Sequence, residues 1–144
     1  MHGKLARKHV VRILFRLIVL SGLATTADAQ SLQVIGYAGV LGEWELTANV
    51  TQKTSGRTTS EFYGPLTMTH VGLCTQAGPE QKSGEISFRI FGSSFAMFGS
   101  SASIEAKLLV DGVECSYSAR LSDAYKGLMN CPDRRAVPLT LWLK

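Results

Sequence analysis

The chain has 144 residues, of which 45% are hydrophobic and 18% charged, with a formal net charge of +4 at pH 7. This length fits one ordinary domain and leaves no room for two. Five of the 15 Lys and Arg residues precede Gln30, as does one of the 11 acidic residues, so the rest of the chain carries ten of each sign. Such a balance lacks the basic footprint of proteins that bind nucleic acid or anionic membrane surfaces.

The N-terminal segment has the pattern of an export signal. Basic residues at positions 4, 7, 8, 12 and 16 come first, an apolar run over 17–24 follows, and Ala27 and Ala29 end the segment. This order predicts a signal peptide over 1–29, cleaved after Ala29. A membrane anchor is the alternative, but Arg12 and Arg16 shorten the apolar run below the roughly 18 to 20 residues that span a bilayer. We therefore expect a single β domain over 30–144 that is periplasmic or secreted, with no transmembrane anchor in the mature chain.

Apolar and polar residues alternate in several stretches of the mature chain. Trp44, Leu46, Ala48 and Val50 share one side of an expected strand, and similar alternation recurs over 61–70, 85–90 and 137–144. Period two is typical of a strand with one buried and one wet face. No stretch has a sustained helical period, so parallel strands would lack crossover helices. The pattern predicts an all-β fold, a small antiparallel β-barrel or β-sandwich of about 6–8 strands.

Two hairpins can be placed with their register. Asp111-Gly112 lies between alternating runs and is a strong signal for a two-residue turn, because both residue types tolerate positive φ. The turn pairs Val110 with Val113 and sets the inward pairs further along: Leu108 with Cys115, Ala106 with Tyr117, and Ile104 with Ala119. A second hairpin is expected from Ser116–Leu121 through a turn centred on Asp123 into Tyr125–Cys131.

Three cysteines remain in the mature chain: Cys74, Cys115 and Cys131. A hairpin centred on Asp123 sets Cys115 directly opposite Cys131, close enough for a cross-strand disulfide bond. An oxidising compartment permits such a bond. The alternatives are a bond from Cys74 to either of the other two, or three unpaired buried thiols.

The sequence contains no catalytic or metal-binding constellation. His70 is the one histidine after the leader, and Cys74 follows it by four residues near the end of the same expected strand. In an extended segment their side chains share a face but stand well apart, and no third residue completes a triad. No CxxC or HxxxH pair is present to bind zinc. We therefore expect no catalytic residues, no metal and no cofactor.

The best binding candidate is an apolar segment over 90–101, rich in Gly and Ser. It contains Phe91, Phe95, Met97 and Phe98, and its simpler interpretation is a strand and turn with the aromatic residues in the core. The functional interpretation is an apolar lip that, with Trp44, holds a ligand or partner. A hollow interior lined by Trp44, Phe62, Phe88 and Tyr117 would favour a small ligand. A filled interior with an exposed patch of Phe95 and Phe98 would favour a protein partner.

Two resemblances follow from particular residues. Gly42-x-Trp44, at the start of the first strong strand, resembles the Gly-x-Trp of lipocalin-like barrels, in which the Trp plugs one end of the cavity. The wider chain is similar to small uncharacterised exported β-proteins of alphaproteobacterial type, through segments spread over most of the mature chain: 72–75, 82–86, 109–117 and 137–142. The second resemblance implies an extracytoplasmic compartment and no particular activity.

These observations favour a non-enzymatic binding or inhibitor-like module in the periplasm, with a protein or a small apolar ligand as partner. The alternative is a structural or envelope-associated protein with no small ligand. A third hypothesis is a small thiol-dependent enzyme or redox protein that uses Cys74.

Overall fold

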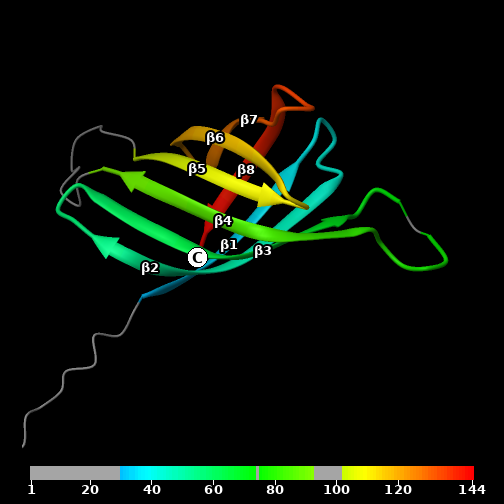
Figure 1. Cartoon of the computed structure of the whole chain (residues 1–144). Helices are drawn as coiled ribbons and strands as arrows, with labels where there is room; N and C mark the ends of the chain where they lie inside the picture. Colours follow the sequence, from blue (N-terminus) through cyan, green and yellow to red (C-terminus); the bar gives the residue numbers. More distant parts are fainter. Residues whose placement is uncertain (1–29, 74, 93–101) are drawn as a thin grey trace, which may run out of the picture.

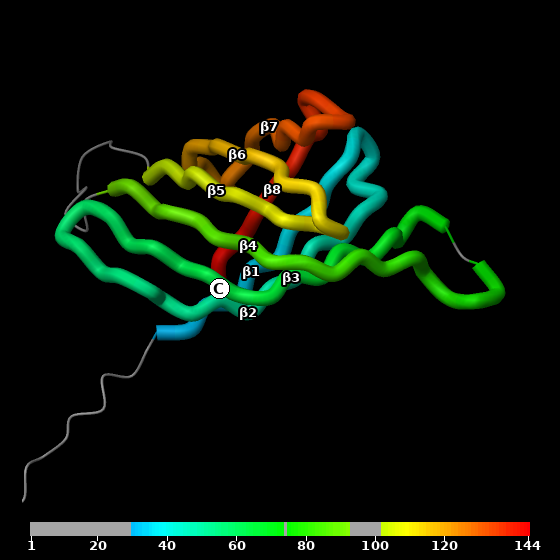
Figure 2. The backbone as a smooth tube through the Cα atoms, in the orientation of Figure 1, coloured from blue at the N-terminus to red at the C-terminus, as the bar shows by residue number. Residues whose placement is uncertain are grey.

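The computed structural model describes residues 30–73, 75–92 and 102–144. Eight antiparallel strands make up these residues: β1 (Ser31–Ala38), β2 (Trp44–Ser55), β3 (Thr59–His70), β4 (Gln81–Phe91), β5 (Ser103–Val110), β6 (Val113–Leu121), β7 (Tyr125–Asn130) and β8 (Val137–Leu143). Each strand pairs with the next along the chain, and β8 pairs with β1 to close the barrel (Figures 1 and 2). The described residues include no helix of the length and apolarity that crossing a membrane requires.

The closing pair of strands distinguishes a barrel from a sandwich. Gly36 of β1 lies opposite Leu141 of β8, and the ladder runs from Val34 to Ala38. The sheet therefore has no open edge, and every strand has a paired neighbour on both sides. The all-β prediction is confirmed, and the fold is the barrel rather than the sandwich.

Both predicted hairpins are present in the predicted register. Asp111 and Gly112 have φ values of 49° and 79°, as a two-residue turn with both central residues in the left-handed region requires. Val110 pairs with Val113 and Leu108 with Cys115 across β5 and β6. Across β6 and β7, the ladder begins at Leu121 and Tyr125, as a turn centred on Asp123 demands.

The first strand has no counterpart in the sequence analysis. Val34, Gly36 and Ala38 face the barrel interior, but the outward positions include Ile35 and Tyr37, which are not polar. Ile35 lies opposite Trp142 of β8, and the Tyr37 ring packs edge-on to the Trp142 ring at 6.1 Å between centroids. Because this apolar contact lies on the outer face, it hides the period-two pattern that marks the other strands.

Apolar side chains fill the barrel interior, and none of the described charged side chains is buried. Phe62 and Phe88 stack at 5.2 Å between ring centroids. The Tyr117 hydroxyl donates a hydrogen bond to the Tyr125 carbonyl at 2.7 Å, with the Leu139 carbonyl at 3.2 Å as a second acceptor. Burial raises the pKa of Tyr117 well above its usual range. Each fully buried large apolar side chain stabilises the fold by about 1.5–3 kcal/mol.

Glycines bring neighbouring strands close where the sheet coils. A Cβ at Gly64, in the middle of β3, would lie 2.2 Å from the Asn49 carbonyl oxygen and 2.8 Å from the Val50 Cα of β2. At Gly84 of β4, a Cβ would overlap the Leu109 carbonyl of β5. Any larger residue at these positions would push the strands apart, so the curvature of the barrel depends on them.

Candidate functional site

Two neighbouring connections at one end of the barrel expose large apolar side chains. The β1–β2 connection holds Val40 and Leu41, which are 82% and 87% exposed, and the β3–β4 connection holds Val71 and Leu73, which are 49% and 64% exposed. We call these four residues the apolar tip. Figure 1 shows both connections on the right-hand side of the barrel, where the β3–β4 connection extends furthest.

Backbone and carboxylate hydrogen bonds shape the β1–β2 connection. Gly39 and Gly42 have φ values of 98° and 67°, so both occupy the left-handed region that glycine tolerates without strain. The Gly42 amide donates to the Gly39 carbonyl at 3.2 Å, and the Leu41 amide donates to Glu43 Oε2 at 3.1 Å. The turn is therefore held by its own polar groups, which leaves the side chains of Val40 and Leu41 pointing into solvent.

The β1–β2 connection is also hydrogen-bonded to the β3–β4 connection and to the start of β8. The Val71 amide donates to the Glu43 carbonyl at 2.8 Å, and the Gly39 amide donates to the Pro138 carbonyl at 2.9 Å. The first bond ties the β3–β4 connection to the turn, and the second ties the start of β8 to it. These bonds connect the turn that carries Val40 and Leu41 to the elements on both sides of it. A surface that is already ordered loses less conformational entropy when it binds.

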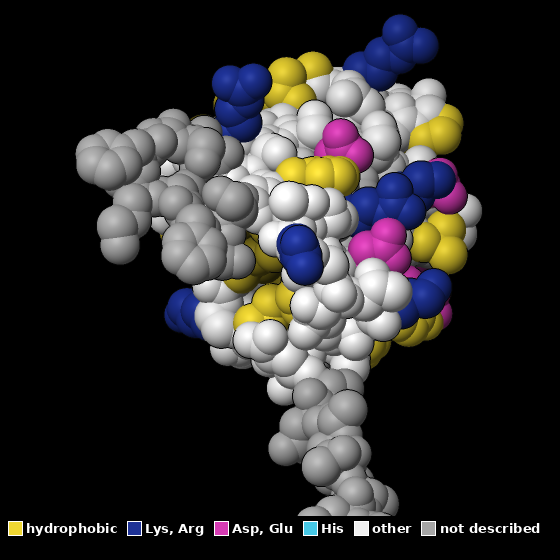
Figure 3. Space-filling model, turned by 90° about the vertical axis from the view of Figure 1, so that its left-hand side faces the viewer, with side chains coloured by type: hydrophobic (Ala, Val, Ile, Leu, Met, Phe, Trp, Pro, Cys, Tyr) yellow, Lys and Arg dark blue, Asp and Glu magenta, His cyan; other side chains and the backbone are white. Residues whose placement is uncertain are grey.

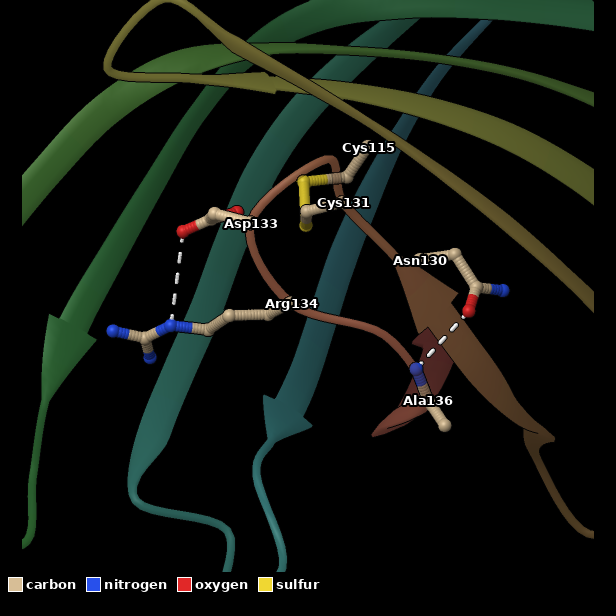
Figure 4. The surroundings of a disulfide bond; sticks show 6 residues. All are labelled: Cys115, Asn130, Cys131, Asp133, Arg134 and Ala136. Carbon is tan, nitrogen blue, oxygen red and sulfur yellow. Dashed lines mark hydrogen bonds and ion pairs between the residues drawn. A yellow bond between two sulfur atoms is a disulfide. The ribbon is translucent and has the colours of Figure 1, made fainter.

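The disulfide bond lies at the same end of the barrel. Cys115 near the start of β6 is bonded to Cys131, the residue that follows β7, as the hairpin register predicted. Their Cα atoms are 4.2 Å apart, the spacing of a closely approaching antiparallel pair. Beyond Cys131 the chain turns sharply (Figure 4): the Ala136 amide donates to Asn130 Oδ1 at 3.0 Å, and Ala136 has a φ of 57°. The disulfide therefore anchors the β7–β8 connection beside the apolar tip.

Trp44 lies at the base of the apolar tip, at the start of β2. Its ring contacts the His70 ring edge-on, with 4.7 Å between centroids, and the Lys82 Nζ lies 5.0 Å from its centroid. His70 Nδ1 is buried, and it has no hydrogen-bond partner among the residues that the structure describes. Trp44 is partly buried and packs against the core. It follows directly on the β1–β2 connection that carries Val40 and Leu41.

The other predicted binding residues do not join Trp44. Phe91 ends β4 and pairs with Thr59 and Ser103, at the opposite end of the barrel from Trp44. Phe95, Met97 and Phe98 lie outside the described residues, as does Cys74. Trp44 and Phe91 therefore cannot contribute to one compact site, although the sequence analysis grouped them.

The interior positions that would line a cavity are occupied by packed side chains. Phe62, Phe88 and Tyr117 are 5%, 3% and 3% exposed. The sequence analysis associated a small ligand with a hollow interior lined by these residues. In the structure all three instead belong to the packed hydrophobic core.

The described residues contain no group of three or more His, Cys, Asp and Glu side chains placed to hold a metal ion.

The apolar tip was missed in the sequence analysis, although Gly39-Val40-Leu41-Gly42 carries a signal. Two large apolar residues between two glycines indicate a tight turn that exposes hydrophobic side chains.

No family model matches the chain, and neither the curated proteins nor the solved structures contain a match. The eight-stranded closed barrel, its disulfide bond and its apolar tip are therefore the basis for a functional proposal.

Proposed function

We propose that this protein is a non-enzymatic binding or inhibitor-like module of an extracytoplasmic compartment that engages a protein partner with its apolar tip. One observation carries the proposal: Val40 and Leu41 are more than four-fifths exposed on a turn that its own hydrogen bonds hold in place. Ordered apolar side chains in solvent are typical of interaction sites, because folding leaves them in water and their burial at an interface is favourable through the hydrophobic effect.

The shape of the site favours a concave partner surface. A narrow hairpin end projects its side chains outward, so the complementary surface is a cleft or pocket that receives them. Each apolar side chain of this size that becomes fully buried contributes about 1.5–3 kcal/mol before the costs of association. The tip would then act as an anchor of the kind that dominates protein interfaces.

The compartment is proposed on the disulfide bond and the export pattern together. A Cys115–Cys131 bond is consistent with an oxidising environment outside the cytoplasm, since cytosolic thiols are kept reduced. The N-terminal pattern over 1–29 points the same way.

Site-specific photocrosslinking in the producing cells tests the proposal. A photoreactive side chain at position 41 should give one discrete cross-linked product of higher mass. The matched control is position 121, where Leu121 at the end of β6 is 39% exposed and lies at the opposite end of the barrel from the tip. Excess unlabelled protein should compete for the product, and a Leu41→Ser competitor should be weaker by at least about tenfold.

Two outcomes would refute the assignment of the apolar tip. One is the absence of a discrete product from position 41. The other is the same product from position 121, which would show contact without recognition by the tip.

A further inference from the structure

A concave surface distinct from the apolar tip crosses the outer face of strands β3–β7. It has a volume of about 890 Å³ and is formed by outward-facing side chains of these strands together with Lys53 of β2. The inward-facing residues between them, such as Phe62 and Phe88, are buried and also belong to its lining. The volume falls within the range of small-molecule sites in proteins, roughly 300–1,000 Å³.

The strand register arranges the lining side chains in two rows that run across the strands. The first row follows directly opposed positions from Glu61 through Arg89, Glu105 and Ser118 to Leu128. The second row runs in the same way through Tyr63, Ser87, Lys107, Ser116 and Asn130. Five neighbouring strands at about 4.8 Å spacing give a groove roughly 19 Å long, which suits an elongated ligand.

A bulge in β2 extends the first row by one cation. The register shifts between Gln52, which is opposite Phe62, and Thr54, which is opposite Glu61. Lys53 is therefore the additional residue, and it lines the groove at this end of the row. Bulges commonly redirect a side chain in this way. The row therefore alternates Lys53, Glu61, Arg89 and Glu105.

The charges of the groove nearly cancel. Arg89 forms an ion pair with Glu61, and Lys107 forms one with Glu114 at 3.1 Å. Figure 3 shows one face of the molecule, on whose right-hand side Lys and Arg side chains alternate with Asp and Glu side chains. The lining has three cations, Lys53, Arg89 and Lys107, against the two acids Glu61 and Glu105, so its excess is a single positive charge. A nucleic acid or another polyanion would need a larger excess of cations. The ligand that fits is uncharged.

Hydroxyl, amide and aromatic groups complete the lining. Ser87, Ser116, Ser118 and Asn130 offer groups that can both donate and accept hydrogen bonds. The Tyr63 ring is 50% exposed, and its hydroxyl donates to Glu85 Oε1 at 3.2 Å. This bond raises the pKa of Tyr63 and holds the ring in place.

We propose that this groove binds a short, uncharged oligosaccharide. A sugar unit has hydroxyl groups that pair with planar carboxylate, guanidinium and amide groups, and an apolar face of C–H bonds that packs on an aromatic ring such as Tyr63. A peptide is disfavoured because the closed barrel has no open sheet edge to which an extended chain could add. The site is separate from the apolar tip and does not depend on the function proposed for it.

Isothermal titration of the purified protein with cellohexaose, maltohexaose and chitohexaose tests the proposal. At least one of these hexasaccharides should bind with a dissociation constant in the micromolar to millimolar range. The Tyr63→Ala variant should weaken that binding by roughly tenfold, since the stacked ring is lost. Tyr37→Ala is the matched control, because Tyr37 is an outward-facing tyrosine, 41% exposed and bonded to Glu45, that lies outside the groove.

A second variant pair keeps the test valid if Tyr63→Ala is poorly folded. Lys107→Ala removes an exposed groove cation and should weaken binding several-fold, whereas Lys126→Ala removes an exposed cation outside the groove and should leave binding unchanged. Absence of heat from all three hexasaccharides at millimolar concentration would overturn the proposal. Equal losses in groove and control variants would overturn it as well, as would binding of unstructured peptides in the groove without binding of sugar.

Discussion

The disulfide bond gives the sharpest quantitative prediction for the stability of the barrel. Cys115 and Cys131 are 16 residues apart in sequence, and the bond closes that loop in the unfolded chain. The chain-entropy estimate for a loop of this size is about 3 kcal/mol. The Cys115→Ala/Cys131→Ala double variant should therefore lose about 3 kcal/mol of unfolding free energy, which is roughly a 150-fold shift toward the unfolded state.

Alanine is the suitable replacement at these positions. Cys115 is 3% exposed within the core, so serine would bury a hydroxyl group among apolar neighbours and confound the measurement. Loss of the buried sulfur adds at most about 1 kcal/mol. At roughly 4 °C per kcal/mol for a domain of this size, the melting temperature should fall by about 12–16 °C.

Urea denaturation followed by circular dichroism measures the effect in the oxidised protein and in the double variant. The m-value should rise in the variant, because the unfolded chain without a cross-link exposes more surface. Cys74→Ser is the control, since it removes the third thiol and leaves the bonded pair intact. A double variant within about 1 kcal/mol of the parent would refute the entropic argument. So would a Cys74→Ser variant that loses as much stability as the double variant does.

Three further predictions concern the core and the close strand contacts. Tyr117→Phe removes a buried hydroxyl group that donates a hydrogen bond at 2.7 Å, so the free energy of unfolding measured in urea should fall by about 1 kcal/mol. Tyr125→Phe should lower it by less, because the Tyr125 ring is buried but its hydroxyl makes no comparable hydrogen bond among the described residues. Burial raises the pKa of Tyr117, so the neutral phenol stabilises the fold at neutral pH and that contribution decreases as the pH rises above 10; a pH titration of stability should show the loss, and Tyr117→Phe should reduce it. Gly64→Ala would place a methyl group 2.2 Å from the Asn49 carbonyl oxygen and should destabilise the barrel by more than about 2 kcal/mol, detected as a lower melting temperature; an unchanged melting temperature would show that β2 and β3 can separate without cost.

Local sequence patterns predicted the parts of the fold that depend on neighbouring residues. Asp111-Gly112 determined both its turn and the register of β5 and β6, and the same arithmetic around Asp123 led to the disulfide bond. These predictions succeeded because a two-residue turn fixes which residues face each other. The closing pair, β8 with β1, joins opposite ends of the domain, and no local pattern specifies it.

The positions of the candidate binding residues relative to one another could be derived only once the order and direction of the strands were known. In a barrel whose successive strands alternate in direction, the start of β2 and the end of β4 lie at opposite ends. Trp44 begins β2 and Phe91 ends β4, so alternation alone separates them, once the order of the strands is known. The sequence analysis left barrel and sandwich open and therefore could not separate these residues.

The groove across β3–β7 could not be predicted from the alternating pattern. Its side chains occupy the polar positions of each strand, and such positions are normally interpreted as a solvated face. Whether that face is flat or concave depends on the coiling of the sheet, which close contacts such as that of Gly84 with the Leu109 carbonyl allow. Curvature is a property of several strands together, so it appears first in the structure.

The exposed residues of the apolar tip are not among those that stabilise the core of this barrel. A small domain must use most of its apolar residues in its core, and here the inward positions of all eight strands do so. Val40 and Leu41 add almost nothing to that core, and the turn that carries them is held by the Gly39, Gly42 and Glu43 hydrogen bonds. Polar residues at these two positions would preserve the turn and improve solubility. Folding therefore does not account for the apolar character of the tip, whereas the partner contact proposed above would account for it.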